Sequence, residues 1–332
     1  QIGSDINGEA ANDNSGWSVS LSTDGSTVAI GTPNNDGNGV TSGHVRVYKN
    51  VTNVWTQIGS DINGESVGDG SGWSVSLSAD GSTVAIGAFF NDGNGTDSGH
   101  VRVYKNIVDV WTQMGADIDG EAAGNRSGWS VSLSADGSTV AIGAYLNDGN
   151  GTDSGHVRVY KNIADVWTQI GDDIDGEAVG DESGYSVSLS TNGSVIAIGA
   201  YRNDGSASNS GHVRVYQNVV GVWTQIGSDI NGEAANDNSG WSVSLSADGS
   251  TVAIGALSND ENGTDSGHVR VYDLSSVLSL NSFIQSNFSV YPNPTSERLT
   301  IDLENNLILE KVNIYNTLGQ IIKTESNTTI DV

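Results

Sequence analysis

Residues 73–88 read WSVSLSADGSTVAIGA, and this stretch decides the fold class of the chain. Its first half alternates Trp, Val and Leu with serine, which is the period-two pattern of a strand with one buried face. The Asp80-Gly81 pair that follows is typical of a tight hairpin, because glycine tolerates a positive φ. Residues 83–88 alternate apolar side chains again, so the stretch predicts a β-hairpin.

Two further strands follow this hairpin. A loop rich in Gly and Asn leads to residues 100–104, which read HVRVY and alternate in the same way. A fourth strand is expected over about residues 110–118. No helical period interrupts the four strands, and a unit of this size does not fold alone, so copies of it must stack on one another.

The same unit occurs five times at a fixed period. Copies begin 56 residues apart, at Gln1, Gln57, Gln113, Gln169 and Gln225. Antiparallel four-stranded units of about this length are blades of a β-propeller, whereas the coils of a parallel β-helix are much shorter. The sequence therefore predicts an all-β protein with a β-propeller of five four-stranded blades.

The ends of the repeat region suggest how the propeller closes. Residues 1–6 resemble the end of a fourth strand, and the fifth copy lacks that strand after Tyr272. We expect the N-terminal residues to complete the fifth blade, which would remove exposed strand edges; the alternative is a part of a larger propeller. The expected domains are a propeller over 1–274, a linker over 275–286 and a small C-terminal β-module over 287–332.

Composition excludes several classes of function. The chain has 40 acidic and 13 basic residues, with a net charge of −27, and a field of this sign repels nucleic acid and anionic membranes. It contains no cysteine, so disulfides do not stabilise it, and no apolar run is long enough to predict a membrane span. Most of the acids fall in the loops between the second and third strands and in the crossovers between blades, so one acidic face is expected.

Calcium is the one cofactor that the sequence offers. The loops between the second and third strands combine Asp and Asn oxygens with a glycine-permissive backbone, as hard cations require. The alternative is that Asn, Asp and Gly only form turns. The candidate calcium ligands are Asp92, Asn94, Asp97, Asp148, Asn150, Asp153, Asp260, Asn262 and Asp265.

Five histidines also recur, one per repeat, at His44, His100, His156, His212 and His268. Equivalent positions on separate blades are related by rotation and cannot converge on one ion, so a repeated structural contact is expected instead. An arginine follows two residues after each histidine. We expect these arginines to stack on aromatic rings of the neighbouring blade, such as Trp55 or Trp111.

The repetition argues against catalysis. An active site brings different groups to one reacting atom, whereas almost every polar residue here is present five times. No catalytic residue is assigned, and the protein is predicted not to be an enzyme. The few departures from the repeat with polar side chains are Arg126, Glu182, Tyr185 and Arg202.

The repeat resembles a known family. Residues 71–76 (SGWSVS), 84–88 (VAIGA) and 99–104 (GHVRVY) are similar to the FG-GAP repeat of integrin-α-type propellers. The resemblance implies a propeller that serves adhesion, ligand binding or scaffolding. It also implies a calcium loop on the first hairpin, where this chain has only residues 79–82, so the sequence does not support calcium at that place.

The C-terminal region resembles a second family. Residues 288–295 (FSVYPNPT), 299–301 (LTI) and 312–320 (VNIYNTLGQ) are similar to the type IX secretion sorting domain of Bacteroidota, here expected to be truncated. The motif residues are Tyr291, Pro292, Asn293, Pro294, Leu318 and Gly319. The resemblance implies export by the type IX machinery to the medium or the outer cell surface.

Together these features predict an exported, non-catalytic binding or adhesion protein. Its expected partner is an extracellular polysaccharide or protein, bound at the acidic face. Two alternatives stay open: a structural surface repeat with no specific ligand, and an accessory domain of an extracellular hydrolase.

Overall fold

The computed structural model describes residues 1–278, 288–291, 298–303, 309, 311–315 and 321–331. The chain divides into two compact units, Gln1–Asp273 and Leu274–Val332. The first unit contains the repeats and is all-β. Residues 275–278 form one helical turn at the start of the expected linker, and the rest of that linker lies outside the described residues. No helix in the described part of the chain is long and apolar enough to cross a membrane.

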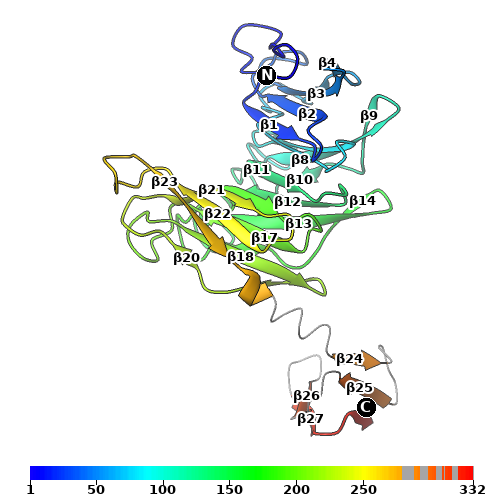
Figure 1. The fold of residues 1–332 in the computed structure, drawn as a ribbon, viewed down its shortest axis with the longest axis vertical. Coiled ribbons are helices and arrows are strands. Elements are labelled where there is room, and N and C mark those ends of the chain that lie inside the picture. The colour runs from blue at the N-terminus through cyan, green and yellow to red at the C-terminus, as the bar shows by residue number, and fades with distance from the viewer. Residues whose placement is uncertain (279–287, 292–297, 304–308, 310, 316–320, 332) are drawn as a thin grey trace. The chain divides into compact units, whose positions relative to one another are not determined.

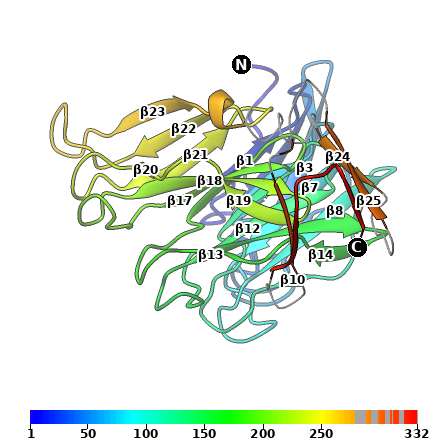
Figure 2. The same cartoon turned by 90° about the horizontal axis from the view of Figure 1, so that it is seen from below.

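Each repeat forms one antiparallel sheet, or blade, and the sheets follow one another around a common centre (Figures 1 and 2). The strands of the first four blades are β1 (Ser18–Leu21), β2 (Thr27–Thr32), β3 (His44–Val51), β4 (Val54–Gln57) and β5 (Ile62–Asn63); β6 (Ser74–Leu77), β7 (Thr83–Ala88), β8 (His100–Ile107), β9 (Val110–Gln113) and β10 (Ile118–Asp119); β11 (Ser130–Leu133), β12 (Thr139–Ala144), β13 (His156–Ile163), β14 (Val166–Gln169) and β15 (Ile174–Asp175); and β16 (Ser186–Leu189), β17 (Val195–Ala200), β18 (His212–Val219), β19 (Val222–Gln225) and β20 (Ile230–Asn231). The fifth blade has β21 (Ser239–Leu245), β22 (Thr251–Ala256) and β23 (His268–Asp273).

The hairpin predicted from residues 73–88 is present as β6 and β7, with Leu77 opposite Val84. Its turn is closed by Asp80, whose Oδ1 accepts hydrogen bonds from Ser78 Oγ at 2.7 Å and from the Ser82 amide at 2.9 Å. The carboxylate is therefore used to hold the turn, in the Asx manner expected of a short Asp-Gly connection.

The prediction of one continuous fourth strand over residues 110–118 is wrong. The strand is split into β9 and β10, and both pair with β8. The break lies at Gly115, whose φ of 71° is in the left-handed region that favours glycine. After this turn β10 pairs again with β8 of the same blade, while the Met114 carbonyl accepts a hydrogen bond from Trp167 Nε1 of the next blade at 2.7 Å.

The hydrophobic core lies between blades rather than within them. Val101 and Val103 of β8 pack with Leu133, Val140 and Ile142 of the next blade, and all five side chains are buried. Hydrogen bonds cross the same seam, as from the Leu133 amide to Ser76 Oγ at 3.0 Å. A single repeat thus cannot bury its own apolar face, which confirms that neighbouring copies stabilise one another.

The five sheets confirm the blade architecture, but the expected pairing of residues 1–6 with the fifth blade is wrong. The fifth sheet contains only β21, β22 and β23, and Val269 and Val271 of β23 are 69% and 65% exposed. The N-terminal residues lie on the first blade instead, where the Ile2 carbonyl accepts a hydrogen bond from Trp55 Nε1. The first sheet (blue) lies above the fifth (yellow and orange) in Figure 1, so the two end faces do not meet.

The second unit is a small β-module. Its strands are β24 (Phe288–Tyr291), β25 (Arg298–Leu303), β26 (Val312–Tyr315), β27 (Ile321–Glu325) and β28 (Thr329–Asp331). They form one sheet in the order β24-β25-β28 and a hairpin of β26 and β27. Ile301 and Ile330 are buried between its elements.

Candidate ligand-binding sites

Four equivalent grooves have volumes of about 220, 250, 300 and 170 Å³ in chain order. The last three lie between successive blades, and the first lies between residues 4–7 and the first blade. Each has in its lining the Asp that directly precedes Ile6, Ile62, Ile118 or Ile174, together with one Tyr and one Trp of the blade that follows. Further aspartates line individual grooves, namely Asp109, Asp119, Asp165, Asp172 and Asp175. We call these the inter-blade grooves. Their Asp, Tyr and Trp residues are Asp5, Tyr48 and Trp55; Asp61, Tyr104 and Trp111; Asp117, Tyr160 and Trp167; and Asp173, Tyr216 and Trp223.

The fold fixes the aromatic walls of each groove. Trp111 Nε1 donates a hydrogen bond to the Ile58 carbonyl of the preceding repeat at 2.8 Å. A side chain at Gly59 would collide with the indole, because an added Cβ would lie 2.7 Å from Trp111 Cδ1. The other wall is Tyr104, whose pKa is raised by burial, and Arg102 lies over its ring at 5.5 Å. The arginines therefore stack on a tyrosine of their own strand, and the prediction that they stack on a neighbouring tryptophan is wrong.

The carboxylates that line the grooves are also held in place by hydrogen bonds. Gln113 Nε2 donates to Asp117 Oδ1 at 2.6 Å, and the same bond recurs between Gln57 and Asp61 at 2.7 Å. Aromatic rings provide flat apolar surface, while a carboxylate accepts hydrogen bonds from hydroxyl groups. A groove with this lining suits a small polyhydroxylated unit, and four copies suit a repeating ligand.

The residue before Asp109, a lining residue of the second groove, is apolar and has a strained backbone. Val108 forms the tip of the hairpin between β8 and β9 with φ 52°, and it is 90% exposed. A β-branched residue at positive φ is unusual, and such strain is found where function requires the side chain. Val220 is equivalent in the fourth blade, with φ 52° and 94% exposure.

The four departures from the repeat come together on the third and fourth blades. Glu182 pairs with Arg202 Nη1 at 2.8 Å, and Arg202 lies over Tyr201 at 5.3 Å. Tyr185 stacks on Tyr201 at 4.4 Å between ring centroids. On the neighbouring blade Arg126 donates to the Tyr145 hydroxyl at 3.3 Å, and the ring of Tyr145 lies 5.6 Å from that of Tyr185.

These residues extend a row of rings along the inner edge of the blades. The aromatic ladder consists of Trp17, Trp73, Trp129, Tyr185 and Trp241, with successive centroids 4.5, 4.8, 5.3 and 4.7 Å apart. Burial raises the pKa of Tyr185 to about 12 and also raises the pKa of Glu182. Arg126 and Glu182 occupy a position with φ 57° and 54°, where the other repeats have Asn or Gly. A positive φ is unfavourable for arginine and glutamate, so these two side chains occupy the position at a cost to the backbone.

The candidate calcium ligands lie in exposed loops and hold those loops together. The backbone amides of Asp97, Asp153 and Asp265 donate to Oδ1 of Asp92, Asp148 and Asp260 at 2.8, 2.8 and 2.7 Å. Asn94 and Asn150 donate their side-chain amides to the carbonyls of Gly120 and Gly176, both at 2.8 Å. Asn262 lies in the corresponding loop of the fifth blade. This is the turn-forming role that the sequence offered as the alternative, and calcium binding stays a prediction.

Each histidine lies on its own blade, at the start of the third strand, and His44, His100, His156 and His212 are 1% exposed. The structure adds what the sequence analysis missed: each lies close to acidic side chains from other segments. In the first four blades a Glu stands 35 residues before the His and an Asp 17 residues after it, as with Glu65, His100 and Asp117. That constant spacing is the signal by which the partners could have been found.

In the second unit, Tyr291 ends β24 and is 49% exposed. The other motif residues, Pro292, Asn293, Pro294, Leu318 and Gly319, lie outside the described residues.

Comparisons with known proteins agree with the fold. A family model described as FG-GAP repeat matches residues 7–48, 63–104, 117–160 and 231–272. A second, described as a secretion system C-terminal sorting domain, matches residues 289–332, which identifies a sorting signal for export through the type IX machinery to a secreted or surface location. No curated protein matches the chain.

Solved structures of similar fold include the hydrazine synthase of Kuenenia stuttgartiensis, at 15% sequence identity and a TM-score of 0.52. The superposition covers 79% of this chain and 66% of the hydrazine synthase chain. The chain thus spans just under two thirds of that protein. The periplasmic gluconolactonase PpgL of Pseudomonas aeruginosa is similar at 16% identity and a TM-score of 0.51, covering 95% of this chain and 85% of its own. At these identities the likeness concerns the β-propeller fold.

Proposed function

Because this chain belongs to the FG-GAP repeat family and carries a secretion sorting domain, we propose that it is an exported, non-catalytic protein that binds an extracellular polysaccharide through the inter-blade grooves. The observation that carries the proposal is the fourfold recurrence of an Asp, a Tyr and a Trp in equivalent grooves. A polymer with a repeating unit can occupy several equivalent grooves at once, and each added contact is then intramolecular. Weak single grooves thereby give strong overall binding.

The sequence led us to expect binding at the acidic loops between the second and third strands and at the crossovers between blades. The proposed grooves include crossover residues such as Asp61 and Asp117, but not those loops. Each groove has two aromatic walls and a held carboxylate, whereas the loop carboxylates accept hydrogen bonds from their own backbone. The grooves therefore offer more side-chain groups for contact with a ligand than the loops do. Their near-identity also supports a non-catalytic role, because the four sets provide the same groups in the same places.

Replacing Asp109 and Asp165 by glycine tests the grooves. Both aspartates line a groove, have φ of 61° and 63°, and correspond to Gly221 in the fourth blade, so glycine fits the backbone. We expect the double variant to bind a recognised polysaccharide at least about 10-fold more weakly, since one hydrogen bond to a charged group contributes about 1.5–3 kcal/mol and about 1.4 kcal/mol corresponds to tenfold. A glycan array with calcium and with chelator identifies the polysaccharide, and titration calorimetry measures the change.

The matched control is Asp97→Asn, which alters an exposed loop carboxylate outside the grooves. Its affinity should equal that of the parent protein. Equal losses in both variants would place binding on the acidic loops, and no binding to any polysaccharide would favour the structural role without a ligand.

Replacing Val108 by asparagine should separate stability from binding. Asparagine tolerates a positive φ, so relief of strain is expected to stabilise the protein by about 0.5–1 kcal/mol. The same change removes an exposed apolar group next to the groove residue Asp109 and should weaken polysaccharide binding. Thermal melts and calorimetry on one sample measure both effects; a variant that binds better than the parent would show that the valine has no role in recognition.

A further inference from the structure

We propose that Glu65, His100 and Asp117, and the three equivalent sets in the first, third and fourth blades, are zinc sites, and that those of the second, third and fourth blades join the crossover from the preceding blade to the blade that carries the histidine. The other sets are Glu9, His44 and Asp61; Glu121, His156 and Asp173; and Glu177, His212 and Asp229. In each set one imidazole nitrogen and two carboxylate oxygens lie within 4.8 Å of one another. These sites are separate from the calcium loops, but Asp61, Asp117 and Asp173 also line inter-blade grooves.

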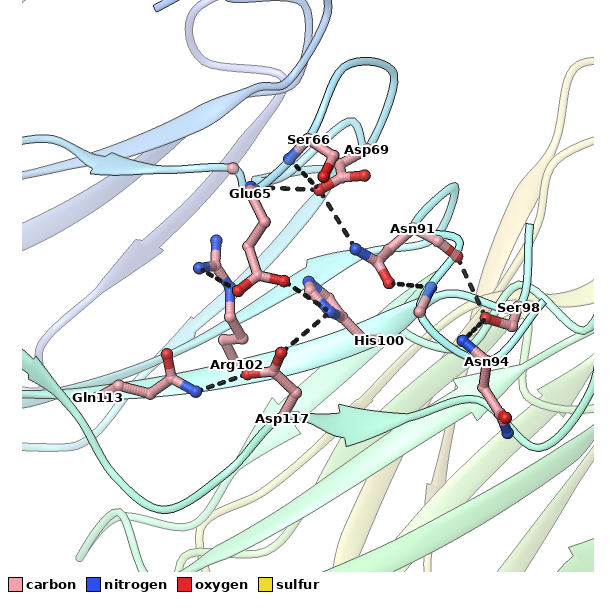
Figure 3. A network of polar contacts seen from close by, with 12 residues as sticks. Glu65, Ser66, Asp69, Asn91, Asn94, Ser98, His100, Arg102, Gln113 and Asp117 are labelled. Carbon is pink, nitrogen blue, oxygen red and sulfur yellow. Dashed lines mark hydrogen bonds and ion pairs between the residues drawn. The ribbon is translucent and has the colours of Figure 1, made fainter. Parts of the chain in front are cut away.

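The imidazole of His100 is buried and unsatisfied. Its side chain is 1% exposed, and both ring nitrogens lack a hydrogen-bond partner. A buried polar group without a partner is costly, so such groups require an explanation. Nδ1 faces Glu65 Oε2 and Asp117 Oδ2, each at 3.8 Å (Figure 3). These separations are too long for hydrogen bonds.

The separations do match ligands that share one ion. Zinc lies about 2.0–2.2 Å from nitrogen and oxygen ligands, so two ligands of a tetrahedral site are roughly 3.3–3.6 Å apart. Glu65 is 41% and Asp117 27% exposed, so a movement of a few tenths of an ångström is available to both. Three protein ligands and one position open to solvent is a common zinc arrangement, and an imidazole with two carboxylates is a suitable donor set.

Neighbouring residues already orient both carboxylates. Arg102 Nη1 lies 3.5 Å from Glu65 Oε1, and Gln113 Nε2 donates to Asp117 Oδ1, so each carboxylate has one oxygen held and presents the other to Nδ1 (Figure 3). Asp69 Oδ2 accepts the backbone amide of Glu65 at 3.2 Å and fixes the segment that carries it. Such outer partners are typical of metal sites, because they set the direction of each ligand.

Charge and protonation are compatible with a cation. Two ionised carboxylates together carry the charge that balances a divalent ion. A neutral imidazole and ionised carboxylates are the forms that bind metal.

Zinc bound here would add a further link between blades that already meet through side-chain packing and through hydrogen bonds, such as that from the Ser71 amide to the Ser42 carbonyl. Glu65 belongs to the crossover from the first blade, whereas His100 and Asp117 belong to the second. An ion bound only by the folded array stabilises it. The fifth blade has Glu233, Glu261 and His268 but no corresponding Asp, and its histidine is 16% exposed.

Titration calorimetry of the chelator-treated full chain with Zn²⁺ tests the proposal. We expect four ions per chain, one for each Glu-His-Asp set, and a higher melting temperature with zinc than with chelator. Asp117→Asn keeps the size of the side chain and its contact with Gln113 but removes one ligand charge, so it should bind three ions. Its melting temperature in chelator should equal that of the parent.

The control is again Asp97→Asn, which should bind four ions. If Asp117→Asn binds as many ions as the parent, or if Asp97→Asn loses an ion as well, zinc is held diffusely by the acidic surface and the proposal fails. Failure of the parent to bind zinc also overturns it. Polysaccharide binding is measured separately on chelator-treated protein, so neither proposal depends on the outcome of the other.

Discussion

Replacing Gly143 by alanine is expected to destabilise the propeller by about 3 kcal/mol or more. A Cβ at this position would lie 2.0 Å from the Gly184 carbonyl oxygen of the next blade and 2.3 Å from Ser130 Oγ. The carbonyl belongs to the backbone of a neighbouring blade and cannot move aside without shifting that blade. Overpacking of a close interface typically costs 1–3 kcal/mol, and more when backbone must move.

The fifth blade provides the matched control for this prediction. Gly255 has the same place in its sheet, but an added Cβ there would come close only to the side chain and backbone of Ser242, with Oγ at 2.4 Å. A hydroxyl can rotate away, so Gly255→Ala should cost less than about 1 kcal/mol. Denaturant unfolding of both variants measures the difference. Equal losses would mean that strand geometry, rather than the approach of the next blade, requires glycine.

Replacing Leu133 by alanine is expected to cost about 3 kcal/mol. Leu133 is 7% exposed and packs against Val101 and Val103 of the preceding blade. Removal of a buried leucine side chain typically costs 2–5 kcal/mol, because a cavity remains between the two sheets. Thermal and denaturant melts measure the loss.

Leu21 is the same residue of the repeat at the open end of the array, where it is 57% exposed. Leu21→Ala should change the free energy of unfolding by less than about 0.5 kcal/mol, as surface substitutions do. A loss comparable to that of Leu133→Ala would show that the first blade is covered in solution, which would contradict the open end faces seen here.

Much of each blade was predictable, because strands and tight turns are encoded locally. The hairpin of β6 and β7 follows from alternating side chains and an Asp-Gly turn. The break in the fourth strand was not predicted, since the apolar pattern runs on either side of Gly115 and only its positive φ separates β9 from β10. The stacking of Arg102 was also missed, because period two places Tyr104 on the same face but does not show which ring the guanidinium selects.

The candidate sites, too, were only partly predictable from the sequence. The sequence showed that a histidine equivalent to His100 is present in every repeat, and that these histidines cannot all bind one ion. The partners of His100, Glu65 and Asp117, were not recognised, because they come from segments far away in the chain that only the stacking of blades brings together. The four departures from the repeat were noted as asymmetries, but their convergence on the third and fourth blades became visible only in the structure.

The sequence by itself determined the period, the strands, the turn chemistry and the sorting motif, since each depends on residues close together in the chain. The tertiary structure alone decided what the hairpin of residues 73–88 packs against, which carboxylates face each histidine, and where the aromatic grooves lie. It also decided that the two end faces remain apart. The physical reason is that all of these depend on the relative placement of successive blades, and that placement is set by core packing and close backbone approach across the seams rather than by local preference.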